Sequence, residues 1–151
     1  MKVVIVGGVA GGATAAARIR RLNEQAEIVV FERSGYISYA NCGLPYYIGD
    51  VITDPEELTL QTPESFFSRF RIMMKVLHEV TAIHHDRKTV SVRNLKTGEE
   101  FEEGYDKLIL SPGAKPTQPK LSGMEANKLF TLRTVDDTFK IKAYINNNHQ
   151  K

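Results

Sequence analysis

The sequence has a single cysteine among its 151 residues and no long uninterrupted apolar run. One thiol cannot build a disulfide framework within the chain, which excludes the disulfide-stabilised class of secreted domains. Without a run of about 18 apolar residues, no membrane-spanning helix is predicted. The formal net charge of +2 is too small to indicate binding to nucleic acid or to an anionic membrane. We therefore expect a cytoplasmic protein with neither of these partners.

The N-terminal segment contains a strand, a turn, a helix and a second strand. Lys2–Val6 is a short β-branched run typical of a buried parallel strand, and Gly7–Gly12 follows as a flexible turn. Ala13–Leu22 predicts a helix, and Ala26–Phe31 predicts a second buried strand that is closed by Glu32. This succession, within about 30 residues, predicts one βαβ unit and therefore a parallel sheet.

Downstream of this unit, the sequence predicts a loop and two helices. A polar and aromatic loop covers Arg33–Asn41, and a short helix covers the region from Gly43 to Ile48. A longer helix begins with Thr62 as its N-cap and Pro63 at its first position, and it runs through Phe70.

Several strands follow. The strand-like segments are Ile72–Val76, His78–Ile83, Thr89–Arg93, Glu100–Glu103 and Leu108–Leu110. Alternation around Lys96-Thr97-Gly98 predicts an antiparallel meander with a glycine hairpin turn. The last strand ends at Ser111-Pro112-Gly113, and a final helix over Val135–Ile145 precedes a polar tail, Asn146–Lys151. The predicted fold class is α/β: a Rossmann-like domain with a parallel sheet and a small antiparallel β-meander.

The glycine turn between the first strand and helix predicts a dinucleotide site. Such a turn presents backbone N–H groups at the positive end of the helix dipole, where they hold a pyrophosphate without side-chain charge. Glu32 stands at the end of the second strand, where a carboxylate accepts hydrogen bonds from ribose hydroxyls. The usual glycine fingerprint is matched at Gly7 and Gly12, whereas Val9 stands in place of its middle glycine.

Two other interpretations of this turn are open to test. The same residues nearly form a phosphate-binding P-loop, but Ala13 stands where that loop needs its lysine, which argues against a nucleoside triphosphate. A glycine turn can also serve only to pack a helix tightly on a strand. Glu32 and the complete βαβ context favour the dinucleotide interpretation.

The lone cysteine, Cys42, lies just before the short predicted helix, where the helix dipole favours a thiolate. Because it has no partner cysteine, it cannot cycle as an internal disulfide. A sulfenic acid, a persulfide or a mixed disulfide with a small thiol is left. A buried, inert cysteine is the alternative, but the polar, aromatic and glycine-bearing loop around Cys42 favours a reactive one.

Four segments of the sequence resemble the same protein family. They are VVIVGGVAGGATAAARIRRLN, SYANCGLPYYIGD, HEV at His78–Val80 and YDKLILSPGAKP at Tyr105–Pro116. Together they resemble the coenzyme A-disulfide reductases, the single-cysteine branch of the pyridine nucleotide-disulfide oxidoreductases. NADH oxidases, NADH peroxidases and persulfide reductases are near relatives. The resemblance extends over essentially the whole chain.

The resemblance implies FAD as the cofactor and coenzyme A as the thiol partner. The FAD contacts that it implies are Gly7, Gly8, Val9, Ala10, Gly11 and Gly12 at the pyrophosphate, Glu32 and Arg33 at the ribose, Val80 at the adenine, and the turn Ser111, Pro112 and Gly113. It makes Cys42 the catalytic redox centre. The coenzyme A contacts that it implies are Thr14, Arg18, Arg21, Ser38 and Asn41. Where the family often has a lysine, this chain has Phe70, flanked by Arg69 and Arg71.

Helical spacing agrees with the coenzyme A contacts on the first helix. Thr14, Arg18 and Arg21 share one face, as expected for residues at i, i+4 and i+7. Ala15, Ile19 and Leu22 share another, which predicts the apolar stripe against the sheet. Arginines in a last helical turn also complement the helix C-terminus, so this spacing alone does not establish a phosphate site.

No metal site is predicted, because His84-His85-Asp86 lies in a strand-to-turn segment with no further ligand pattern. Members of the family are far longer than this chain, so residues 1–151 are expected to be the N-terminal segment of an FAD-binding domain, without the NAD(P)H-binding and dimerisation domains. The implied enzyme is a homodimer that reduces coenzyme A disulfide, or a related disulfide or persulfide, with NAD(P)H. Alternatives are an NADH oxidase or peroxidase with a cysteine sulfenic acid, and a non-catalytic nucleotide-binding fragment.

Overall fold

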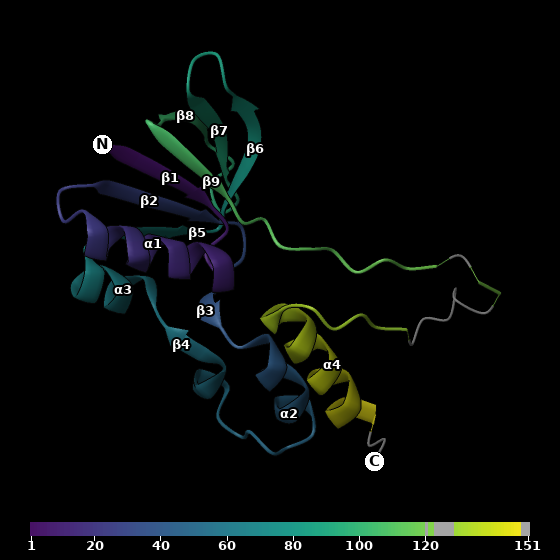
Figure 1. The fold of residues 1–151 in the computed structure, drawn as a ribbon. Coiled ribbons are helices and arrows are strands. Elements are labelled where there is room, and N and C mark those ends of the chain that lie inside the picture. The colour runs from purple at the N-terminus through teal and green to yellow at the C-terminus, as the bar shows by residue number, and fades with distance from the viewer. Residues whose placement is uncertain (120, 123–128, 149–151) are drawn as a thin grey trace. The chain divides into compact units, whose positions relative to one another are not determined.

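The structure is a computed structural model that describes residues 1–119, 121–122 and 129–148 (Figure 1). The chain divides into two compact units, each built from two segments. The first unit is Met1–Tyr39 with Thr59–Gly113, and the second is Ala40–Leu58 with Ala114–Lys151. No described helix is both long enough and apolar enough to cross a membrane.

A four-stranded parallel sheet forms the centre of the first unit. Its strands lie in the order β5 (Met73–Val76), β2 (Glu27–Glu32), β1 (Lys2–Val6) and β9 (Lys107–Leu110). Helix α1 (Ala10–Leu22) connects β1 to β2, and every pairing in the sheet is parallel. The βαβ unit predicted from the sequence is therefore confirmed, and β1 has the predicted bounds.

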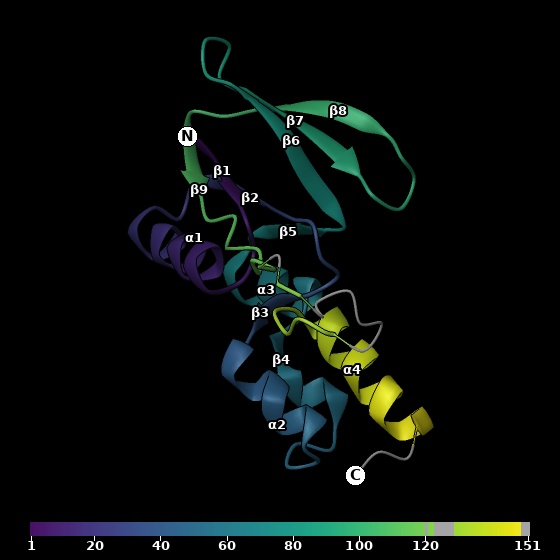
Figure 2. The same cartoon turned by 90° about the vertical axis from the view of Figure 1, so that its right-hand side faces the viewer.

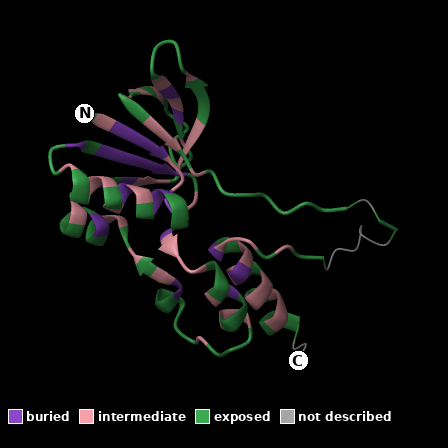
Figure 3. Cartoon of the chain, viewed as in Figure 1, coloured by how far each residue is buried: buried purple, intermediate pink, exposed green. Residues whose placement is uncertain are grey.

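The two faces of this sheet are covered differently, because alternate side chains of a strand point to opposite faces. Val3 and Ile5 lie in one core cluster with residues of α1 and of α3 (Pro63–Phe70). Val4 lies in a second cluster with Val90 and Val92. Figure 3 shows the buried strands between these two coverings.

The second covering is the predicted antiparallel meander, which the structure confirms. Strands β6 (His78–His84), β7 (Thr89–Asn94) and β8 (Glu100–Gly104) pair in sequence order, on the opposite side of the sheet from α1 (Figure 2). The hairpin turn has Gly98 in the left-handed region at φ +78°.

Helix α1 differs from its prediction at its start and on its buried face. It begins at Ala10, three residues before the predicted start. Gly12, Ala13 and Ala16 are its buried residues, whereas Leu22, placed in the predicted apolar stripe, is 68% exposed. Small residues face the sheet because the first turn of α1 lies close to the backbone of Gly7, the residue that follows β1. The predicted stripe was therefore wrong at Leu22, whereas Ile19 does pack against the core cluster.

The sequence analysis missed a short β-ribbon, of which one strand lies in the loop predicted over Arg33–Asn41 and the other in a segment with no predicted element. Strand β3 (Ile37–Tyr39) pairs antiparallel with β4 (Thr59–Gln61), and β4 leads into α3. The start of α3 is as predicted, because Thr62 accepts a hydrogen bond from the Ser65 N–H and Ser65 accepts one from the Thr62 N–H.

The second unit consists of short helices packed on one longer helix. The 3₁₀ turn η1 (Asn41–Gly43) runs into α2 (Leu44–Ile48), and a further 3₁₀ turn, η2, covers Pro55–Leu58. Helix α4 (Val135–Asn148) extends three residues beyond its predicted end. Tyr47 of α2 contacts Phe139 of α4 edge-on, with 5.7 Å between ring centroids. The rest of the predicted polar tail, residues 149–151, lies outside the described residues.

Candidate functional site

The turn after β1 is crowded by backbone at two of its glycines. Gly7 has φ +96°, and a Cβ there would lie 2.0 Å from the carbonyl oxygen of Ser111. A Cβ on Gly12 would lie 1.8 Å from the carbonyl oxygen of Gly7. Both positions therefore require glycine, one for its backbone conformation and both for the close approach of neighbouring chain.

The same turn offers backbone donors to a ligand. The first hydrogen bond of α1 runs from the Ala13 N–H to the Val9 carbonyl, at 3.1 Å. The N–H groups of Ala10, Gly11 and Gly12 consequently have no acceptor within the helix. No acidic side chain lies in the first turn of α1. This geometry suits an anion such as a pyrophosphate.

Glu32 is tied to the glycine turn more closely than the sequence suggested. Its carboxylate is buried, and Oε2 accepts the Gly8 N–H at 2.8 Å. Oε1 accepts the Ser34 N–H, also at 2.8 Å. Both oxygens thus fix local backbone, although a carboxylate oxygen can accept a second hydrogen bond. The predicted contact with a ribose stays a prediction.

Two of the other predicted FAD contacts directly follow strands of the parallel sheet, since Arg33 comes after β2 and Ser111 after β9. The Ser111 N–H donates to the Val6 carbonyl at 2.7 Å, which places the Ser111 turn beside the glycine turn. Arg33 forms an exposed ion pair with Glu79 at 4.0 Å. Val80 lies in β6 and packs against the core cluster beneath the meander. In open α/β sheets, ligands bind outside the carboxyl ends of the strands, which is where the glycine turn lies.

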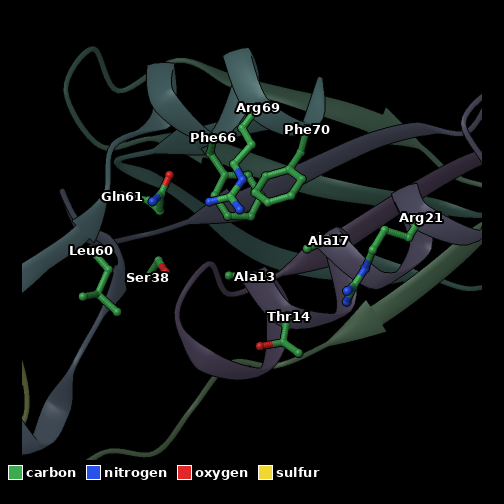
Figure 4. A pocket seen from close by; sticks show the side chains of 10 residues that line it. All are labelled: Ala13, Thr14, Ala17, Arg21, Ser38, Leu60, Gln61, Phe66, Arg69 and Phe70. Atoms are coloured by element: carbon green, nitrogen blue, oxygen red, sulfur yellow. The ribbon is translucent and has the colours of Figure 1, made fainter.

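A cavity of about 340 Å³ lies between α1, α3 and the β3–β4 ribbon (Figure 4). Three predicted coenzyme A contacts, Thr14, Arg21 and Ser38, line it together. The sequence analysis missed other lining residues, which are Leu60, Gln61, Phe66 and Arg69. Arg18 is exposed and is not among the lining residues, and Asn41 belongs to the second unit.

Cys42 is the middle residue of η1, rather than a residue preceding a helix that begins at Gly43. It is exposed and free, which contradicts the alternative of a buried thiol, and its reactivity stays a prediction. Leu44, the first residue of α2, is 1% exposed and anchors the end of the turn. That this thiol lies beside a flavin held by the first unit stays a prediction.

Comparisons with known proteins agree with this arrangement. The family model described as pyridine nucleotide-disulphide oxidoreductase matches residues 1–149. The chain is 50% identical to a coenzyme A disulfide reductase of Staphylococcus aureus over 147 residues, 97% of this chain and 33% of that protein. It thus spans about a third of the length of the curated relatives that it matches.

Comparison with solved structures finds reductases and an oxidase of similar fold. Reduced Bacillus anthracis CoADR-RHD superposes with a TM-score of 0.95 at 55% identity, covering 98% of this chain and 27% of that one. An NAD-dependent persulfide reductase from A. fulgidus has a TM-score of 0.90 at 34% identity, covering 97% and 28%. A water-forming NADH oxidase from Lactobacillus brevis has a TM-score of 0.86 at 31% identity, covering 99% and 32%.

Proposed function

Because the chain belongs to the pyridine nucleotide-disulphide oxidoreductase family, we propose that it is the FAD-binding N-terminal part of an enzyme that reduces coenzyme A disulfide with NAD(P)H. The observation on which this rests is the exposed, unpaired thiol of Cys42 in the turn Asn41-Cys42-Gly43-Leu44-Pro45. A lone accessible thiol can form a mixed disulfide with a small thiol, whereas an internal disulfide needs a second cysteine.

FAD fits the glycine turn on steric and electrostatic grounds. The N–H groups at the start of α1 would hold its pyrophosphate, and the close contacts at Gly7 and Gly12 fix the turn that presents them. Glu32, Arg33 and Val80 are the proposed contacts of the adenosine end, and Ser111–Gly113 the second flavin-contacting turn. When bound, a flavin supplies two-electron transfer between a nicotinamide and sulfur.

The proposed chemistry at Cys42 is thiol–disulfide exchange. The Cys42 thiolate attacks coenzyme A disulfide, forms a mixed disulfide and releases one coenzyme A as thiolate. Two electrons and one proton then cleave that mixed disulfide, which restores the Cys42 thiolate and releases the second coenzyme A as thiol.

Thr14, Arg21 and Ser38 are proposed to contact coenzyme A from the cavity that they line. Guanidinium groups suit this ligand, since they bind phosphate through charge-assisted hydrogen bonds. Arg18 and Asn41, which are exposed, are proposed as further contacts. The NAD(P)H site, the homodimer and the cytoplasmic location are proposals for the whole protein, of which this chain covers about a third in its curated relatives.

Mass spectrometry of the intact chain tests the role of Cys42. After incubation with coenzyme A disulfide, the chain should gain one coenzyme A, and a thiol reductant should remove it. Cys42→Ser should gain none. A wild-type chain without an adduct would overturn the proposal.

In the whole enzyme, Cys42→Ser should abolish disulfide reduction and retain the flavin absorbance. Oxygen and peroxide, assayed beside coenzyme A disulfide, would identify an oxidase or peroxidase. In that case, a sulfenic acid on Cys42 would be trapped by a dimedone-type reagent.

A further inference from the structure

The short helix that follows Cys42 is held at its far end by a lysine from α4. The carbonyls of Pro45–Tyr47 accept backbone N–H groups from the turn after α2. The carbonyl of Ile48, the last residue of α2, accepts a hydrogen bond from the Lys142 ammonium at 3.1 Å. A cation suits this place, because the carbonyls at the C-terminal end of a helix carry partial negative charge.

The same ammonium fixes the residue at which the chain reverses after α2. Lys142 Nζ donates a hydrogen bond to Asp50 Oδ1 at 2.5 Å, and 14% of the Lys142 side chain is exposed. Asp50 has the left-handed φ of +60°, a conformation that costs energy and persists where neighbouring contacts hold it.

A second side chain of α4 contacts α2 beside this lysine. Phe139 lies three residues before Lys142, on the same face of α4, and its ring packs edge-on against Tyr47. Figures 1 and 2 show α4 lying alongside α2. One face of α4 therefore holds the C-terminal part of α2 by an aromatic contact and by an ammonium. We call these contacts of Phe139 and Lys142 the α4 brace.

Contacts continue from the braced residues to the turn that contains Cys42. Ile52, which follows α2 closely, lies beside this turn, since a Cβ on Gly43 would be 3.6 Å from Ile52 Cδ1. At the start of α2, the Leu44 N–H donates to the Asn41 carbonyl and so closes the turn around Cys42. The position of the sulfur thus depends on α2 and on the segment after it, and the α4 brace holds both.

We propose that Lys142 is a positioning residue for Cys42, which fixes α2 and the segment after it so that the sulfur meets a large disulfide in one orientation. The proposal deepens the reductase function and rests on it for the identity of that disulfide. A small reagent reaches an exposed sulfur from many directions. Coenzyme A disulfide must instead bring one of its sulfur atoms into line with the attacking sulfur, so loss of the brace should slow it selectively.

The single cysteine allows the positioning role to be measured without coenzyme A. A nitroxide spin label attached to Cys42 reports the mobility of its turn in the electron paramagnetic resonance spectrum. Lys142→Met removes the ammonium, keeps an unbranched side chain and should sharpen the spectral lines. Lys140→Met removes the same charge from an exposed position on α4 and should leave the spectrum unchanged. Identical spectra of wild type and Lys142→Met would show that Lys142 does not position the turn.

Asp50→Asn is a milder variant, which keeps the test decisive if Lys142→Met does not fold. It removes the ion pair, keeps the hydrogen bond from Lys142 to the Ile48 carbonyl, and leaves a residue type that tolerates the left-handed φ. It should sharpen the lines less than Lys142→Met and have no further effect in a Lys142→Met background, because both changes act through one contact. Equal sharpening by Asp50→Asn in both backgrounds would contradict the brace.

The chemical consequence has its own test, in variants whose fold is verified by circular dichroism. Lys142→Met should form the mixed disulfide with coenzyme A disulfide more slowly by about threefold or more, the size of effect expected when a hydrogen bond to a charged group is lost. Its alkylation by iodoacetamide, a small neutral reagent, should stay within about twofold of wild type. Lys142→Arg should recover most of the rate, and Lys140→Met should keep it within about twofold. An equal loss with both reagents, or an equal loss in Lys140→Met, would refute the positioning role.

The positioning role and the reductase function can fail separately. A wild-type chain that gains no coenzyme A, together with sharpened lines in Lys142→Met, would refute only the disulfide reductase. An adduct that forms equally fast in wild type and Lys142→Met, with unchanged lines, would refute only the brace.

Discussion

The turn after β1 and the turn around Cys42 both lead into a helix, but they are built in opposite ways. In the first, backbone atoms leave no room for a side chain at Gly7 or Gly12. In the second, Gly43 has only ordinary contacts around it, and Cys42 is exposed. Sterics thus fix the shape of the turn proposed to hold a cofactor, whereas the turn that contains Cys42 leaves accessible the sulfur that is proposed to react.

The largest expected effect comes from adding one carbon to the first turn. Gly7→Ala and Gly12→Ala should each lower the free energy of unfolding by at least about 3 kcal/mol, because the new Cβ meets a backbone oxygen that cannot move independently. Urea denaturation followed by circular dichroism measures the loss. Gly35→Ala is the matched control, since nothing lies within 4 Å of a Cβ at that position. Equal stability of all three variants would show that the turn is not crowded in solution.

A smaller effect on stability is expected at the N-terminal end of β1, where Lys2 forms ion pairs with Glu27 and Glu103. The hydrogen bonds that Lys2 donates to Glu103 and, second, to Glu27 raise the pKa of its ammonium above the usual 10.5. A raised pKa contributes stability that is complete below the unfolded value and is lost as the pH rises through the folded value. Lys2→Met should therefore cost about 1 kcal/mol or less at neutral pH.

The loss of unfolding free energy in Lys2→Met should shrink as the pH rises above 10.5. Urea denaturation of both proteins at several pH values measures this change. Lys96→Met removes an exposed charge from the hairpin turn and should show little cost at any pH. A cost for Lys2→Met that stays constant into strong alkali would assign the effect to packing of the side chain rather than to its charge.

The opposite sign is expected for a glycine in the second turn. A Cβ on Gly43 would lie 3.6 Å from Ile52 Cδ1, which is ordinary contact, and Gly43 has the helical φ of −77°. Gly43→Ala should raise the free energy of unfolding by about 0.5 kcal/mol, because alanine has less backbone freedom to lose on folding. The same urea titration compares it with Gly7→Ala. A large destabilisation at Gly43 would remove the distinction between the two turns.

The sequence predicted most accurately those elements whose pattern is local. The β-branched run of β1 gave the bounds of that strand, and Thr62 with Pro63 located the start of α3. The start of α1 was missed because Gly11 and Gly12 have low helix propensity, and the structure places them in the first helical turn for close packing. Tertiary contact overrode propensity there.

The candidate site was predicted less completely, since its residues meet only through long-range pairing. Pairing of β3 with β4 joins segments about 20 residues apart and brings Ser38 to the cavity with Gln61. No local pattern indicated that ribbon. Arg69 was noted only as a neighbour of Phe70, because the sequence does not show which way a side chain near the end of a helix points.

The smallest effect on stability should come from the residue proposed to matter most for chemistry. Cys42 is exposed and its thiol has no disulfide partner, so Cys42→Ser and Cys42→Ala should each change the free energy of unfolding by less than about 0.5 kcal/mol. Both should also lose all reaction with a thiol-specific reagent and with coenzyme A disulfide. A destabilisation comparable to that of Gly7→Ala would mean that the thiol supports the fold of its turn. Variants that keep their stability and lose their thiol reactivity are expected if the Cys42 sulfur is exposed to a ligand and contributes nothing to the fold.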